Sequence, residues 1–406
     1  MSLALHPQPI VQMMEPRTKI YNQRQYAVLR GGSESTWKPV ISTSYSDSSI
    51  QFTAPPPSPG IMIDRKVLIN IPFTITMSAI ASTGSGFVFT TGTAAPRSRP
   101  IPRIIQTAAV TLNNTQVSMN TSDVIDPFLH YCNIAEKREV DDSLSPSMLD
   151  QSPQYSDVNG GVRSPLLAYA SSVSGADTSR GAFPFTVTSN TTGPTGTAVI
   201  NATFTDYLYL PPFLSDADQA SAFINLQTMD FTLTLGNLSR IWSVDNVNAN
   251  CGSVTATISG NPRLFFNYIT PDPLIQVPKS VVYPYYSVDR YPTSNGLALT
   301  AYGTAASTNS VTQSSANIQL NSIPTKMYIF ARQRNQDRTA FTSDIFAGIT
   351  NVSINFDNRS GLLSSATQFD LFKMSQENGM NLSWLQFSRW VGSPVCVVFG
   401  KILPKW

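Results

Sequence analysis

The chain has 406 residues, a length that suggests two or three domains. Charged residues make up only 13% of it and the net charge is +2, which excludes an intrinsically disordered chain and a polybasic nucleic-acid-binding protein. Much of the polarity comes from Ser, Thr, Asn and Gln, while 29 Pro and 22 Gly spread turns along the whole sequence. This composition predicts an all-β protein with many loops.

Residues 1–38 are expected to form an N-terminal arm, since their sequence shows no core-forming periodicity. The arm has a net charge of +3, which comes from five basic and two acidic residues: Arg17, Lys19, Arg24, Arg30, Lys38, Glu15 and Glu34. Such a charge suits a weak, salt-sensitive attraction to an anionic membrane or nucleic acid, and predicts no sequence-specific nucleic-acid binding.

Three distant cysteines, Cys132, Cys251 and Cys396, are too few and too scattered for a disulfide scaffold, and we expect buried free thiols. The N-terminus lacks the apolar region of a secretory signal, and no run of 18 apolar residues predicts a membrane span. The sparse cysteines and the lack of a secretory signal favour a protein made in a reducing compartment.

Alternating apolar residues predict strands from Ser48 onward, in the segments SSIQFTA, KVLINIPFTITMSAI and IIQTAAVTLNN. Asp126 then suits a helix N-cap with Pro127 at the first helical position, so a helix is expected from Pro127 to Glu139. The polar region of about 140–197 is expected to be a long loop insertion, because it has few sustained apolar patterns.

Strand patterns return with AVINATFTDYLYL, and a second short helix is expected where Ser215 to Asp218 fit a capping box. Further strands are predicted in DFTLTLGNL, SVTATIS and RLFFNYI. The proline-punctuated segment PDPLIQVPKSVVYPYYSVDRYP predicts a connection, after which strand patterns restart. We therefore expect two structural units after the arm, residues 39–272 and 273–406.

The two units show an internal repeat. Residues 105–128 match residues 349–372 without a gap at an offset of 244, and the Asn113–Asn114 turn falls on Asp357–Asn358. Each copy is interpreted as a strand, a tight turn, a polar stretch and a short helix. The repeat favours duplication of one β-sandwich design.

A duplicated, loop-rich and cysteine-poor β chain of this size resembles the double jelly-roll major capsid proteins of tectiviruses, adenoviruses, virophages and polinton-like elements. The resemblance lies in the segments FTDYLYLPPFLSDADQASAFINLQTMDFTLTL, RLFFNYITPDPLIQVPKSVVYPY, ITNVSINFDNRSGLLSSATQFDLFKMSQENG and VCVVFGKIL. It implies two consecutive eight-stranded jelly-roll sandwiches with a few short helices and long loops.

The same resemblance implies a homotrimeric, pseudo-hexagonal capsomer that self-assembles into an icosahedral shell, located in the virion. Its partners would be neighbouring capsomers and minor capsid or penton proteins, with an internal membrane or the genome as a further partner of the arm. Two alternatives stay open: a secreted or surface β-sandwich protein that binds or hydrolyses carbohydrate, and a single-jelly-roll shell protein with a protruding domain.

The residues offer little material for an enzyme. No catalytic, cofactor-binding or metal-binding residue is predicted, because no triad, zinc or phosphate-loop motif surrounds the two histidines or the glycines. The histidines and the paired carboxylates that could serve catalysis are expected to have structural or surface roles instead: His6, His130, Glu139, Asp141, Asp142, Asp216 and Asp218. Aromatic residues near the connection and the C-terminus are interpreted as packing or interface rings rather than a sugar platform: Tyr283, Tyr285, Tyr286, Tyr291, Trp384 and Trp390.

Overall fold

The structure is a computed structural model. It describes residues 34–80, 87, 89, 94–97, 99–131, 185–213, 222–244, 250–271, 281–283, 285, 287–293, 311–320, 324–342, 347–356, 359–380, 384, 387 and 396–399. No helix in these ranges is both long and apolar enough to cross a lipid bilayer.

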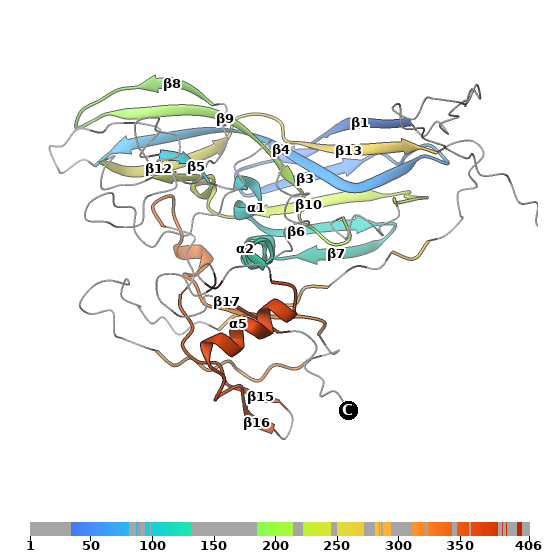
Figure 1. The fold of residues 1–406 in the computed structure, drawn as a ribbon. Helices are drawn as coiled ribbons and strands as arrows, with labels where there is room; N and C mark the ends of the chain where they lie inside the picture. The colour runs from blue at the N-terminus through green and yellow to red at the C-terminus, as the bar shows by residue number, and fades with distance from the viewer. Residues whose placement is uncertain are drawn as a thin grey trace, which may run out of the picture.

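The first half of the chain is a sandwich of two antiparallel sheets (Figure 1). The six-stranded sheet has the order β1 (Glu34–Ile41), β13 (Arg263–Thr270), β4 (Met62–Ala79), β9 (Thr197–Tyr207) and β8 (Thr186–Asn190), with β12 (Cys251–Ile258) also paired to β4. The five-stranded sheet has the order β2 (Ser44–Tyr45), β3 (Ser49–Ala54), β10 (Met229–Leu235), β6 (Ile105–Leu112) and β7 (Thr115–Met119). A small two-stranded sheet joins β5 (Ala94–Pro96) to β11 (Trp242–Val244).

The core forms because side chains alternate between the two faces of each strand. Along the 18-residue β4, every second residue is buried, whereas the intervening ones are partly exposed. Strand β10 alternates in the same way, and the Phe231 ring lies 5.8 Å from the Phe266 ring of the facing sheet. Aromatic contacts of this kind tie the two sheets into one hydrophobic core.

Two of the expected boundaries differ in the structure. Residues 34–38, assigned to the arm by the sequence, lie in β1 and pair with β13. Residues 186–190, assigned to the loop insertion, form β8 at the edge of the same sheet. Both segments are largely exposed, so main-chain pairing makes them strands although they lack an apolar pattern. Strands β1 and β8 are two of the eleven strands in the two described sheets of the first sandwich, against the eight expected.

The helices also differ from expectation. Helix α1 (Pro100–Ile104) precedes β6, and helix α2 spans Thr121–Tyr131, so α2 begins well before Asp126 and holds Pro127 in its interior. The prediction of Pro127 as the first helical residue is therefore wrong. The helix expected at residues 215–218 lies outside the described residues.

The second half contains smaller elements, which lie on the α2 side of the sandwich (Figure 1). They are β14 (Met327–Phe330) paired with β17 (Cys396–Phe399), β15 (Ile354–Phe356) paired with β16 (Arg359–Leu362), the 3-10 turn η5 (Asn335–Asp337) and helix α5 (Gln368–Glu377). Strand β16 begins 244 residues after β7, and each strand ends a hairpin that precedes a helix. The polar stretch of each repeat is thus the second strand of a hairpin.

Candidate functional site

The structure does not describe the side chains of the histidines and carboxylates considered in the sequence. His130 lies in α2, but its side chain is outside the described residues, as are the other candidates: His6, Glu139, Asp141, Asp142, Asp216 and Asp218. The described residues hold no group of three His, Cys, Asp or Glu side chains that could bind a metal ion. Polar residues gather instead at the contact between the two halves.

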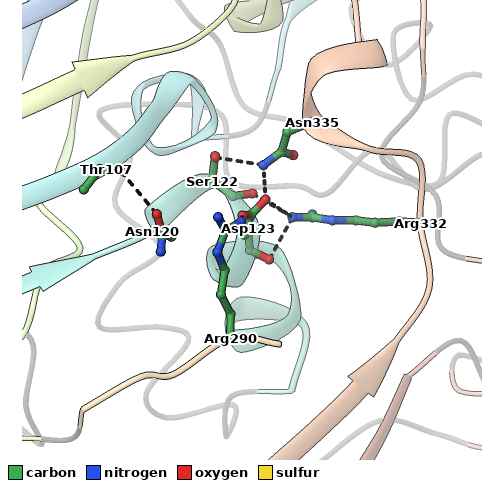
Figure 2. Close-up of polar contacts among 7 residues, drawn as sticks. All are labelled: Thr107, Asn120, Ser122, Asp123, Arg290, Arg332 and Asn335. Carbon is green, nitrogen blue, oxygen red and sulfur yellow. Dashed lines mark hydrogen bonds and ion pairs between the residues drawn. The ribbon is translucent and has the colours of Figure 1, made fainter. Parts of the chain in front are cut away.

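The Asp123 cluster is the first part of this contact. Asp123 lies in the first turn of α2, and its carboxylate forms ion pairs with Arg290 and Arg332 and accepts a hydrogen bond from the Asn335 amide (Figure 2). The same amide donates to the Ser122 hydroxyl at 3.0 Å. Three separate positions of the chain beyond residue 280 therefore converge on one turn of α2.

Pro127 explains why an arginine contacts the main chain here. In an α-helix the N–H of residue 127 would donate to the carbonyl of Asp123, but proline has no N–H. Arg332 instead donates through Nη2 to the Asp123 carbonyl at 2.8 Å and to the Ser122 carbonyl at 2.7 Å (Figure 2). Arg332 of the second half thus donates to the Asp123 carbonyl, which receives no hydrogen bond from residue 127 of its own helix.

The second part of the contact is an arginine clamp, formed by Arg97 and Arg240. Arg97 is fully buried, and its Nη2 donates to the carbonyls of Ala340 at 2.9 Å and Thr342 at 2.6 Å. Arg240 donates through Nη1 to the carbonyls of Thr339 and Thr342, each at 2.9 Å. Two guanidinium groups of the first half therefore hold one short loop of the second half.

The clamped loop is shaped by its own threonines. The Thr339 N–H donates to the Thr342 hydroxyl at 2.9 Å, and this hydroxyl donates back to the Thr339 carbonyl at 3.0 Å. The turn aims its carbonyls at the arginines and buries Ala340, whose own carbonyl also accepts from the Val244 N–H of β11. The loop therefore joins the first half through both side-chain and main-chain bonds.

Tyr283 fixes the connection to the first sandwich. Its hydroxyl accepts from the Ile224 N–H at 2.8 Å and donates to the Ala222 carbonyl at 3.2 Å. The guanidinium of Arg65 lies 5.3 Å from the Tyr283 ring and 5.4 Å from the Phe223 ring. Burial lowers the pKa of Arg65 and raises the pKa of Tyr283. The tyrosine expected to pack thus does so, and also forms hydrogen bonds.

The other aromatic residues considered in the sequence differ in burial and in what they contact. Tyr285 and Tyr291 are exposed beside a pocket of about 570 Å³, which is also lined by residues 116–120 of β7 and the turn after it. Trp384 packs in a small aromatic group with Phe372 and Phe387, at ring distances of 5.3 and 6.2 Å. Tyr286 and Trp390 lie outside the described residues. The described rings therefore divide between packing and the wall of this pocket.

The two contacts could not be found from sequence patterns. Arg97 and its carbonyl partners in the 339–342 loop are 242 to 245 residues apart. Every residue has a main-chain carbonyl, so the sequence does not show which ones accept a hydrogen bond from Arg97. The only sequence signal is Pro127, which removes one helical hydrogen bond wherever it lies inside a helix. Together these contacts can hold two β units in one arrangement, and they offer no chemistry for a reaction.

Comparisons with known proteins agree with this structural role. The family model for the Sputnik virophage major capsid protein first domain matches residues 10–269, and the model for the major capsid protein V20 C-terminal domain matches residues 291–399. The putative capsid protein V20 of Sputnik virophage is 31% identical in an alignment of 403 residues that covers 96% of this chain. The chain spans 66% of the length of that relative.

Two solved structures are similar in fold. The Sputnik virophage structure matches with a TM-score of 0.75 and 29% identity, and covers 98% of this chain and 83% of the matched chain. The mavirus major capsid protein matches with a TM-score of 0.68 and 16% identity over 100% of this chain and 86% of that one. The fold is a double jelly roll, and the chain belongs to the family of virophage major capsid proteins.

Proposed function

We propose that the chain is a structural building block of an icosahedral capsid shell, in which it acts by assembly. The observation that carries this proposal is the 31% identity to a capsid protein over 96% of the chain, together with a common fold. The carbohydrate alternative has no support in the comparisons. An assembly role also suits a chain whose described polar clusters bind its own main chain.

The proposal includes a homotrimer in which each chain contributes two upright jelly rolls, giving a pseudo-hexagonal outline. The two rolls would be residues 39–272 and 273–406, with the arm before them and the insertion of about 140–197 on the particle surface. The Asp123 cluster and the arginine clamp support this proposal, because they hold the two rolls of one chain in register before three chains meet. Neighbouring capsomers, penton proteins and minor capsid proteins would be the partners, and the virion the location.

Light scattering of the purified chain coupled to size-exclusion chromatography tests the trimer. The expected result is a species of three times the 44.3-kDa chain mass, with a six-sided outline in negative-stain electron microscopy. A stable monomer at all concentrations tested would contradict the proposal. Binding of the monomer to a glycan array, with no assembly, would favour the carbohydrate alternative.

A further inference from the structure

The outer face of the six-stranded sheet carries a row of apolar residues. In β4 the buried residues Val67 and Ile69 face the core, so Leu68 between them faces outward. Residues that pair across antiparallel strands share a face, and the register places Pro39 of β1 and Phe265 of β13 in line with Leu68. Most other outward residues of β4 are polar, as is typical of the solvated face of a sheet.

Strand β1 widens this row into a patch. Trp37 and Ile41 lie two positions before and after Pro39, so they share its face. Ile41 is 55% exposed, and Trp37 is also exposed. We call these five residues the β1 patch: Trp37, Pro39, Ile41, Leu68 and Phe265. Neighbouring apolar side chains on an exposed face are typical of a surface that binds another protein.

A second apolar patch lies at helix α5. The Phe369 ring lies 5.9 Å from the Trp384 ring and 6.1 Å from the Phe372 ring. Phe372 and Phe387 are buried, whereas Phe369 is 54% exposed and Trp384 is also exposed. We call Phe369 and Trp384 the α5 patch. Large aromatic rings that are held by packing on one side and exposed on the other are suited to anchor a protein contact.

The internal repeat shows that the exposure of Phe369 is particular to the second half. At the offset of 244, Phe369 corresponds to Ile125 of α2, which is buried in the core of the first sandwich. The second half thus has a large apolar side chain at this repeat position without burying it. A partner outside the chain can bury it instead.

The two patches lie on opposite sides of the chain (Figure 1). The inner face of the six-stranded sheet packs on the five-stranded sheet, and the second half with α5 lies on the other side of the five-stranded sheet, beyond α2. The β1 patch therefore faces away from the α5 patch of its own chain. Each patch can meet the other only on a second copy.

We propose that the β1 patch of one copy binds the α5 patch of a second copy of this chain. The proposal rests on the trimer proposed above and names the surfaces that meet in it. A closed ring of copies is formed by a head-to-tail contact, in which two different surfaces of each copy meet. The Asp123 cluster and the arginine clamp join the two rolls within one chain, so ring closure uses another surface of each roll. The two patches supply one such surface on each roll.

Two substitutions to glutamate test the contact. Ile41→Glu and Phe369→Glu each place a charge in one patch, at a position that is already exposed, so both variants should still fold. Each should raise the concentration at which half of the chains are trimeric by at least about tenfold. Val187→Glu is the matched control and should change this concentration little, because Val187 is exposed in β8, at the opposite edge of the same sheet from β1.

Sedimentation over a dilution series measures trimer formation, and thermal unfolding of the dilute proteins confirms that the variants are folded. A wild-type trimer that Ile41→Glu and Phe369→Glu leave unchanged would overturn this contact alone. A wild-type chain that stays monomeric would overturn the proposed trimer and this contact together.

An equimolar mixture of the two variants tests whether these two patches meet each other. The Phe369→Glu chain keeps its β1 patch and the Ile41→Glu chain keeps its α5 patch, so one intact contact can form between them. The expected result is a heterodimer at concentrations at which neither variant associates alone. A mixture that associates no better than the separate variants would overturn the pairing of the patches.

The photoreactive analogue p-benzoylphenylalanine in place of Phe369 identifies what lies against the α5 patch. In a mixture of light and heavy isotope-labelled chains, cross-links are expected between chains, to peptides of β1 or β13. Cross-links within one chain would overturn the proposal, because they would show that the chain covers its own α5 patch. Cross-links between chains to the second half would also overturn it, since the first roll would then not be the partner.

Discussion

Arg332 occupies the hydrogen-bonding position that Pro127 leaves open in α2. Its guanidinium donates at 2.8 Å to the carbonyl of Asp123, the group to which residue 127 would donate if it were not proline. The side chain of Arg332 is only 8% exposed, so this contact is made away from bulk water. A helix defect in one jelly roll is thereby linked to a charged side chain of the other.

Arg332→Ala should lower the free energy of unfolding by about 2–4 kcal/mol, because it leaves two carbonyls and a carboxylate with fewer partners. Arg334→Ala is the matched control. Its ion pair with Asp337 is exposed and local, so its loss should cost less than about 1 kcal/mol. Urea unfolding of the three proteins measures both differences. Equal costs for the two variants would show that the Arg332 contact adds nothing beyond a surface ion pair.

Pro127→Ala should reduce the effect of removing Arg332. Alanine restores an N–H that can donate to the Asp123 carbonyl, so this oxygen keeps a partner when the guanidinium is absent. A double-mutant cycle with Arg332→Ala is expected to show a coupling of about 1 kcal/mol. Additive effects would mean that the proline and the arginine act independently.

Arg97→Met should destabilise the contact between the halves by about 3–5 kcal/mol, since Met fills the space but donates no hydrogen bond. The carbonyls of Thr339, Ala340 and Thr342 would each lose one of their donors. Arg359→Met, at an exposed position of β16, is the control and should change stability little. The measurement is the rate of proteolysis of the 338–342 loop. If this loop resists proteolysis equally in the Arg97→Met and wild-type proteins, Arg97 does not hold it in place.

The sequence predicted the long core strands well, because burial imposes a period of two on their side chains. Strand β4 is the clearest case, with alternating burial along nearly its whole length. It could not predict β1, whose residues are mostly exposed and whose strand form depends on pairing with residues 263–270. The pattern of apolar residues therefore reports burial, and it misses strands made by main-chain pairing alone.

The start of helix α2 and the contact site were not predicted, for a related reason. Local preference places Pro127 at a helix start, but Arg332 donates to the Asp123 carbonyl, which has no N–H donor at residue 127, and α2 begins at Thr121. Such compensation comes from residues more than 200 positions away, which no local pattern contains. The 244-residue repeat was predictable because a hairpin and a helix follow each other in both copies and keep local signals.

Tyr283→Phe should cost about 1–2 kcal/mol, because the ring packing remains while the hydroxyl bonds to Ile224 and Ala222 are lost. Tyr285→Phe is the matched control, since Tyr285 is 46% exposed and forms no hydrogen bond with the described residues. Thermal unfolding should show a lower transition temperature for the first variant only. Similar shifts for both would contradict the role of Tyr283 in fixing the connection.

Cys251 should make the fold sensitive to alkali. Burial raises the pKa of its thiol from 9.0 to about 11, so the folded state holds the proton more tightly than the unfolded state. This contribution is fully present below about pH 9 and is lost as pH rises toward 11, by about 2–3 kcal/mol at most. Tyr268 and Tyr283, whose pKa values are also raised by burial, act in the same direction but from about pH 10 upward. Urea midpoints at about pH 8 and about pH 10 should therefore fall less in Cys251→Ala than in the wild-type chain. An identical fall in both proteins would rule out the thiol as the titrating group.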